Sequence, residues 1–205
     1  MVLGTDSHTT SHGALGAFAF GIGATEMASV GALGRVLNVE VPATIRVETQ
    51  GRLKKFVTPK DLILYLIGKI TAEGANYKVI EFHGGAITRM SVSGRLTICN
   101  MAVEAGATSG IVPADAETLQ YLREEAGVTG PVEPFLPDAD APYERVVKLQ
   151  LGRIAPQVAC PHMVDNVKPV DELQGVGVTA MLAAADGSLW VAGWEYVARI
   201  DPPTG

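Results

Sequence analysis

Two short stretches of this sequence carry polar side chains that can move protons or bind a carboxylate. The first, Asp6-Ser7-His8, sets a carboxylate, a hydroxyl and an imidazole in a row directly after the apolar residues 1–3. Residues 1–3 read as the end of a buried strand, and ligands of α/β proteins bind just outside the carboxyl ends of strands. The local alternative is a turn in which Asp6 accepts hydrogen bonds from nearby amides and His8 is exposed.

The second stretch contains Asn100 and Glu104, which are four positions apart. If residues 97–105 form a helix, both side chains lie on one face of it. The apolar neighbours Ile98 and Ala102 predict that this face is largely buried, and a buried carboxylate needs a partner. The alternative is a surface glutamate near the end of the helix, where the helix dipole disfavours a negative charge.

The other residues with possible chemistry are weaker candidates. His8 and His12 are also four apart and could bind zinc from one face of a helix. However, Ser11 and Gly13 are poor helix-interior residues, and no glutamate adjoins His8. Structural roles are expected for the remaining candidates, which are Cys99, Cys160, His83 and His162.

Composition excludes several classes of protein. The chain has 205 residues, 47% hydrophobic and 19% charged, which is typical of a folded globular protein. Its net charge is -6 and its Lys and Arg residues are not concentrated, so we expect no binding to nucleic acid. No apolar run reaches the roughly 20 residues of a membrane span, and no signal peptide is expected. The two cysteines make no disulfide framework, which favours the reducing cytoplasm.

The elements that must position these residues alternate between strand and helix. Strands are predicted at 44–49, 77–83 and 145–151, and helices at 58–70, 97–105 and 116–126. This alternation predicts a layered α/β fold. Residues 13–32 are rich in glycine and alanine, which allows close backbone approach to a ligand or between packed elements.

Several ordered blocks of the sequence resemble the aconitase superfamily. They are GTDSHT at 4–9, FGIGATE at 20–26, VIEFHG at 79–84 and TICNMAVEAGA at 97–107. The run from DSHT at 6–9 to HGA at 12–14 is most similar to the large subunits of 3-isopropylmalate dehydratase and homoaconitase. The blocks PQVACPH at 156–162 and VDNVKP at 164–169 fit the same branch. Together the blocks cover about residues 1–175 and imply a three-layer α/β/α fold.

The resemblance implies a hydro-lyase that moves water across a double bond next to a carboxylate, with a [4Fe-4S] cluster as Lewis acid. In such enzymes the residue matching Asp6 polarises a histidine from another part of the fold, and Ser7 would contact substrate. The residue matching Glu104 would pair with His8, so we expect these two side chains to be neighbours. Asn100 would lie beside the cluster and its bound hydroxyl.

The sequence also departs from the family pattern. The three cysteines that hold the family's cluster have no counterpart, since Cys99 and Cys160 do not match ligand positions. The swivelling domain, in this branch normally a separate small subunit, has no counterpart either. We therefore expect an internal fragment of the large subunit. Residues 1–41 would end a first domain, 42–158 would form a second and 159–177 would begin a third.

The segment 178–205 resembles one piece of a β-propeller repeat. Asp186-Gly187 between apolar runs is a hairpin signal, and Trp190 lies in the run that follows. We expect a two-stranded hairpin that packs weakly against the rest of the chain. Two rival functions stay open: a catalytically inactive remnant or fusion product without cluster, and a binding module that acts through this segment.

We predict that the isolated chain binds no [4Fe-4S] cluster tightly and shows no dehydratase activity, because such clusters need several thiolates held in place. Anaerobic reconstitution with iron and sulfide, followed by iron analysis and visible absorption, measures the cluster. Turnover of 3-isopropylmalate measures activity. A stoichiometric cluster, or turnover, would refute this prediction.

Overall fold

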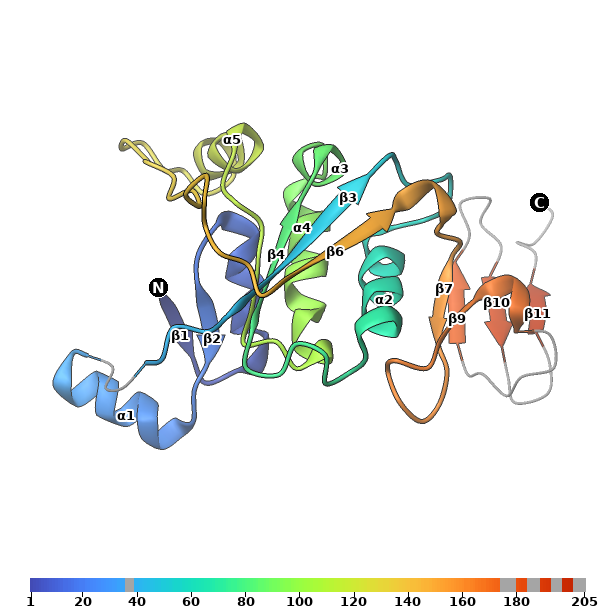
Figure 1. Ribbon diagram of the computed structural model, residues 1–205, viewed down its shortest axis with the longest axis horizontal. Coiled ribbons are helices and arrows are strands. Elements are labelled where there is room, and N and C mark those ends of the chain that lie inside the picture. Colours follow the sequence, from blue (N-terminus) through green and yellow to red (C-terminus); the bar gives the residue numbers. More distant parts are fainter. Residues whose placement is uncertain (36–38, 174–179, 184–188, 193–196, 201–205) are drawn as a thin grey trace.

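A four-stranded parallel sheet forms the centre of the computed structural model, which describes residues 1–35, 39–173, 180–183, 189–192 and 197–200. Its strands are β3 (Thr44–Gln50), β4 (Val79–His83), β5 (Ser109–Ile111) and β6 (Arg145–Gln150), in the order β5-β4-β3-β6. In the parallel register Ile45 lies beside Ile80 and Val47 beside Val147. The predicted α/β class is confirmed (Figure 1).

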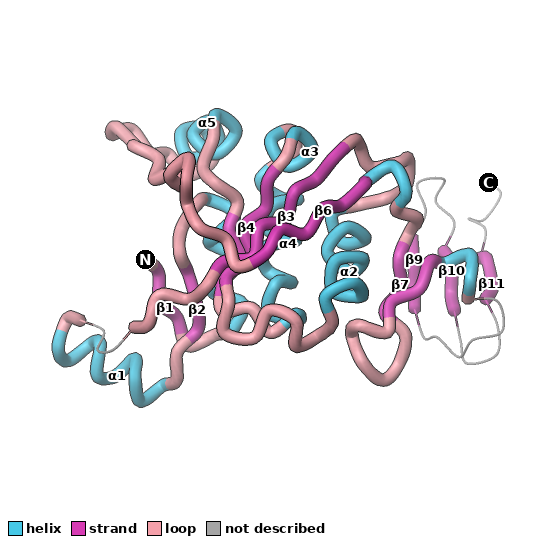
Figure 2. The backbone as a smooth tube through the Cα atoms, viewed as in Figure 1, coloured by secondary structure: helices cyan, strands magenta, loops and turns pink. Residues whose placement is uncertain are grey.

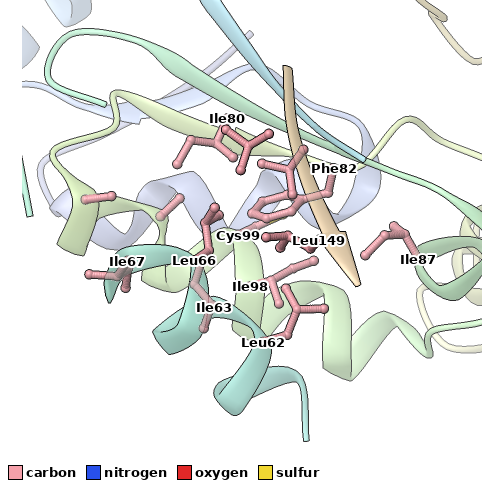
Figure 3. Close-up of a cluster of buried hydrophobic side chains, with 14 of the residues drawn as sticks. Leu62, Ile63, Leu66, Ile67, Ile80, Phe82, Ile87, Ile98, Cys99 and Leu149 are labelled. Carbon is pink, nitrogen blue, oxygen red and sulfur yellow. The ribbon is translucent and has the colours of Figure 1, made fainter. Parts of the chain in front are cut away.

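Alternation along β3 decides which face of the sheet is buried. Ile45 and Val47 are fully buried, and between them Arg46 points to the other face. The buried face packs on helices α2 (Pro59–Ile70) and α4 (Val92–Asn100). Figure 3 shows Leu62, Leu66 and Ile98 from these helices meeting Phe82 and Leu149 from the strands.

The start of α2 follows the local signals of its sequence. Thr58 is the N-cap, Pro59 is the first helical residue, and the Asp61 carboxylate accepts the backbone N–H of Thr58 at 2.7 Å. This reciprocal capping satisfies amides that the helix cannot pair internally. Asp61 also accepts the backbone N–H of Gln157 at 2.8 Å, so the same carboxylate attaches the later hairpin to the helix.

The second helical segment differs from the predicted helix at 97–105. Ser91 caps α4, which begins at Val92, and the α-helix ends at Asn100. A 3₁₀ helix, η2 (Met101–Ala105), continues the chain to Gly106, whose φ of 79° closes it. Because a 3₁₀ helix has three residues per turn, Asn100 and Glu104 do not share the face that a continuous α-helix would give them.

The side chain of Arg95 in α4 links the segment before α4 to the start of the helix at residues 116–124 through hydrogen bonds. Its guanidinium is fully buried and donates to the carbonyls of Thr88 and Met90. It also donates to both carboxylate oxygens of Asp115, at 2.7 and 2.9 Å, and to the hydroxyl of Thr118. All five N–H groups of the side chain thus have an acceptor. Asp115 caps α5 (Ala116–Glu124), and α3 (Gly85–Thr88) precedes α4.

The N-terminal segment forms its own small parallel pair, β1 (Val2–Gly4) with β2 (Ala19–Gly21). Between these strands lies the 3₁₀ helix η1 (Ser7–Leu15), and α1 (Ala24–Leu33) follows β2. Helix α1 buries none of its side chains. It extends away from the central sheet at one end of the molecule (Figure 2).

The C-terminal part contains two antiparallel arrangements. β7 (Gln157–Ala159) pairs with β8 (Val167–Pro169) between the 3₁₀ helices η3 (Leu151–Arg153) and η4 (Val170–Glu172), and the hairpin packs on α2. Strands β9 (Ala180–Ala183), β10 (Leu189–Ala192) and β11 (Val197–Ile200) form a three-stranded sheet. The prediction of a two-stranded hairpin is therefore wrong, because three strands pair in this segment. The predicted turn at Asp186-Gly187 lies outside the described residues.

None of the helices in the described residues combines the length and apolar character that a bilayer crossing requires.

We predict that Asp115→Ala lowers the free energy of unfolding by about 3–5 kcal/mol, because it leaves the buried Arg95 charge without a partner. Burial raises the pKa of Asp115, but the hydrogen bonds from Arg95 and the Thr118 amide outweigh it and hold that pKa below its usual value. The stabilisation is therefore present above the unfolded pKa of about 3.9 and is lost as the pH falls through the lower folded pKa.

Urea unfolding at neutral and strongly acidic pH measures this loss. The matched control is Glu117→Ala, an exposed acidic residue in the same first turn of α5, which we expect to change little. Equal effects of the two substitutions at neutral pH would contradict the prediction.

Candidate functional site

The Asp6-Ser7-His8 stretch lies where β1 passes into η1. Asp6 is the N-cap of η1, and its carboxylate accepts the backbone N–H of His8 at 3.2 Å. The hydroxyl of Thr9 donates to the Asp6 carbonyl at 2.6 Å. Asp6, Ser7 and His8 are all exposed. The capping turn is thus the local structure, and it directs the three side chains toward solvent at a strand end.

Thr10 attaches η1 to the central domain. The side chain is fully buried, and its hydroxyl accepts the Gly110 N–H at 2.7 Å and donates to the Cys99 carbonyl at 3.4 Å. The Gly13 carbonyl accepts the N–H of Val112 at 2.9 Å. One turn of η1 therefore contacts both β5 and the end of α4.

Glycines make this contact possible. A Cβ at Gly13 would overlap the carbonyl oxygen of Gly110. A Cβ at Gly110 would in turn lie 2.7 Å from the Cβ of Ala102 and 3.1 Å from the Cα of Cys99. The close backbone approach predicted for the glycine-rich segment is therefore present, and at Gly13 it is between packed elements rather than to a ligand.

Asn100 joins the second stretch to the first. Its side-chain amide donates to the hydroxyl of Ser11 at 2.9 Å across 89 positions of sequence. Glu104 is half-buried in η2, and η2 contacts η1. The two polar stretches are therefore brought to adjoining elements, although no hydrogen bond or ion pair links His8 to Glu104 among the described residues. Their pairing stays a prediction.

His12 is not placed to bind a zinc ion together with His8. Its Nδ1 lies 2.8 Å from the Thr9 carbonyl, which occupies that nitrogen. A 3₁₀ helix also places His8 and His12 on different faces, because four residues exceed one turn. The described part of the chain contains no group of three His, Cys, Asp or Glu side chains arranged to hold a metal ion.

The two cysteines do not fit a [4Fe-4S] cluster. Cys99 and Cys160 are unpaired thiols, and both are buried. Cys99 belongs to the hydrophobic core, where burial raises the pKa of its thiol far above the usual range. A cluster needs thiolates, and a buried neutral thiol among isoleucines and alanines is a small apolar residue.

A second polar cluster lies on the sheet face opposite the core. His83 Nε2 lies 2.5 Å from Glu81 Oε1, and the hydroxyl of Tyr143 donates to the same oxygen at 3.1 Å. Arg46 stacks over the Tyr143 ring and pairs with Glu48 at 2.9 Å. Burial and then the Glu81 charge raise the pKa of Tyr143. These mutual contacts support the structural role expected for His83.

An open groove lies elsewhere on the molecule. It has a volume of about 650 Å³ and lies between α1, β2 and the start of β3, with Phe18, Phe20, Val30 and Tyr77 among its lining residues. None of the five candidate residues Asp6, Ser7, His8, Asn100 and Glu104 lines it. The groove is flanked by the unburied helix α1 and is separate from the polar site.

Sequence reasoning missed Ser11 as a member of the site. By its local sequence Ser11 is only a poor helix-interior residue beside His12. The available signal was its position three residues after His8, because a serine hydroxyl often bonds a carbonyl of the preceding turn. That bond is present: Ser11 Oγ donates to the His8 carbonyl at 2.7 Å.

Comparisons with known proteins cover most of the chain. The sequence model of the aconitase family (aconitate hydratase) matches residues 1–185. A probable methanogen homoaconitase large subunit of Methanosarcina mazei is 51% identical over 178 residues, which are 87% of this chain and 45% of that protein. A 3-isopropylmalate dehydratase large subunit of Methanopyrus kandleri is 50% identical over 87% of this chain and 42% of its own length.

A third relative, the 3-isopropylmalate dehydratase large subunit of Heliobacterium modesticaldum, is 47% identical over 83% of this chain and 40% of its own length. The chain thus spans less than half of the relatives it matches. The family match also runs past the boundary predicted at 178 and reaches residue 185. It includes β9, so the predicted resemblance of 178–205 to a propeller repeat is not supported.

We predict that Gly13→Ala displaces η1 from β5 and lowers the free energy of unfolding by about 1–3 kcal/mol, the usual effect of forcing a methyl group into a packed contact. Chemical denaturation measures the stability, and the amide signals of Gly110 and Val112 in NMR spectra report the displacement.

Gly31→Ala is the matched control, because a Cβ built at that helical position meets no atom within 4 Å apart from its chain neighbours and the nearby backbone of its own helix. We expect it to be neutral or stabilising, since alanine restricts the unfolded chain. If Gly13→Ala lowered the free energy of unfolding no more than Gly31→Ala does, the close contact between the Gly13 and Gly110 backbones would not constrain the fold.

Proposed function

This chain belongs to the aconitase family, and from that premise we propose that it is part of the large subunit of an iron–sulfur hydro-lyase. The substrate would be a 2- or 3-hydroxy di- or tricarboxylic acid, of the 3-isopropylmalate or homoaconitate type. The names and identities of the relatives support this substrate class. For 3-isopropylmalate, the reaction belongs to leucine biosynthesis.

One observation carries the proposal. The hydrogen bond from Asn100 to Ser11 and the burial of Thr10 hold η1 against α4, so the DSHT and TICNMAVEAG blocks adjoin. In a hydro-lyase of this family those two blocks supply catalytic and substrate-binding groups. Two separate motifs that meet in space support a common site more strongly than either motif alone.

We assign roles to the chain's own residues on this basis. His8 would transfer a proton at its imidazole, with Glu104 holding the tautomer and raising the basicity. Asp6 would orient a histidine from another part of the family fold. Ser7 and Asn100 would bind the substrate. The exposure of Asp6, Ser7 and His8 leaves these groups accessible to such a partner and substrate.

The cluster itself is not assigned to this chain. Its iron would supply the Lewis acid and would need thiolates to hold it, and neither Cys99 nor Cys160 fits that role. We propose that the ligands come from the portion of a family large subunit that the chain does not span. A small subunit carrying the swivelling domain is the proposed partner, since the relatives are named large subunits.

The proposal also includes a division of the chain into domains and a cellular compartment. Residues 1–41 would belong to a first aconitase-type domain, 42–158 to a second and 159–177 to the start of a third. The unpaired state of both cysteines supports a reducing compartment such as the cytoplasm.

A chimaera tests this function. Residues 1–173 replace the matching part of the Methanopyrus kandleri large subunit, which is 50% identical to this chain, and the product is assembled with that enzyme's small subunit. We expect dehydration of 3-isopropylmalate or a close homologue. His8→Ala should lower kcat by about 10²–10⁴-fold, the usual contribution of a general acid–base group.

His162→Ala is the matched control, because His162 lies in the loop between β7 and β8 and carries no assigned role. It should leave turnover near the level of the parent chimaera. Iron content and visible absorption establish that each variant is assembled. A chimaera with a full cluster and no turnover would show that this chain is an inactive remnant.

A further inference from the structure

Ser11 lies between the two halves of the candidate site. Its hydroxyl donates to the His8 carbonyl at 2.7 Å and accepts from the side-chain amide of Asn100 at 2.9 Å. The three residues thus form a chain of hydrogen bonds that joins η1 to the last residue of α4. Ser11 and Asn100 are both partly buried, and so is the hydrogen bond between them, whereas the bond from Ser11 to the His8 carbonyl is exposed.

Because the Ser11 hydroxyl has only one proton, it determines which group donates in each of the two hydrogen bonds. A serine hydroxyl has one proton and two lone pairs. Because the His8 carbonyl can only accept, the single proton of Ser11 points to it. The lone pairs of Ser11 can then only accept, so Asn100 must present its NH₂ group to Ser11 rather than its carbonyl oxygen.

When the NH₂ group of Asn100 donates to Ser11, the carbonyl oxygen Oδ1 of the same amide has no partner within the site. Among the described residues, Asn100 Oδ1 accepts no hydrogen bond, and no buried side-chain polar atom lacks a partner. Oδ1 is therefore accessible, and a ligand or solvent can donate a hydrogen bond to it. If the amide were reversed, the site would offer an N–H donor at this point instead.

We propose that Ser11 is a positioning residue that sets the amide orientation of Asn100, so that Oδ1 accepts a hydrogen bond from the hydroxyl group of the substrate. The proposal rests on the proposed function for its substrate, a hydroxy acid. The orientation itself rests only on the contacts of Ser11. The same hydroxyl holds the His8 carbonyl, so Ser11 also couples the backbone of His8 to the position of Asn100.

NMR of the ¹⁵N-labelled full chain tests the orientation. Ser11→Ala removes the acceptor, and we expect the Asn100 side-chain amide signals to shift. Exchange of these amide protons with water should accelerate about tenfold, the factor that one hydrogen bond of ordinary net strength accounts for. Ser11→Thr keeps the hydroxyl and should restore both properties.

Two further variants keep the test decisive. Ser11→Cys preserves size with a much weaker donor and acceptor, and it should resemble Ser11→Ala even if the alanine variant folds poorly. Ser93→Ala, an exposed position on α4, is the matched control and should leave the Asn100 signals unchanged. Unchanged signals in Ser11→Ala and Ser11→Cys, or no recovery in Ser11→Thr, would overturn the proposal.

The chimaera described above tests the catalytic consequence. There Ser11→Ala should lower kcat for the hydroxy acid and Ser11→Thr should recover it. If the NMR changes occur and kcat stays at the parent value, the link from Asn100 to substrate is overturned. If the parent chimaera itself is inactive while the NMR changes occur, the proposed function fails and the Ser11–Asn100 orientation stands.

Discussion

The arrangement of the site depends on the contact between Gly13 and Gly110, where two backbones meet without intervening side chains. This contact sets how deeply η1 lies on β5 and α4. Thr10 reaches both elements only because the backbone is so close, and Ser11 follows Thr10 directly. The polar groups at the start of η1 are therefore placed by this steric constraint together with the hydrogen bonds of Thr10 and Ser11.

The sequence predicts best those features whose causes are local. Thr58, Pro59 and Asp61 mark the start of α2, and Asp115 marks the start of α5, because a cap acts within one turn of its helix. The strand at 44–49 follows from alternation alone. The break between α4 and η2 was not predicted, since Gly110 packs against Cys99 and Ala102 from another part of the chain.

The same reasoning explains what was missed in the site. Arg95 lies before the helix predicted at 97–105, and no local pattern predicts its burial. It is fully buried because its guanidinium pairs with Asp115, 20 positions later. The partner of Ser11 is Asn100, and the local sequence around neither residue predicts this contact. The family resemblance did predict that the two stretches meet, because it carries information about tertiary contacts that periodicity and capping do not contain.

Thr10 and its partner Gly110 are 100 positions apart, and this separation has a consequence for synthesis on the ribosome. At about 5–20 residues per second, η1 emerges roughly 5–20 s before β5 exists. During that interval the glycine-rich segment has no surface to dock on. The nine residues of η1 are mostly polar or small, so η1 itself exposes little apolar surface during that interval.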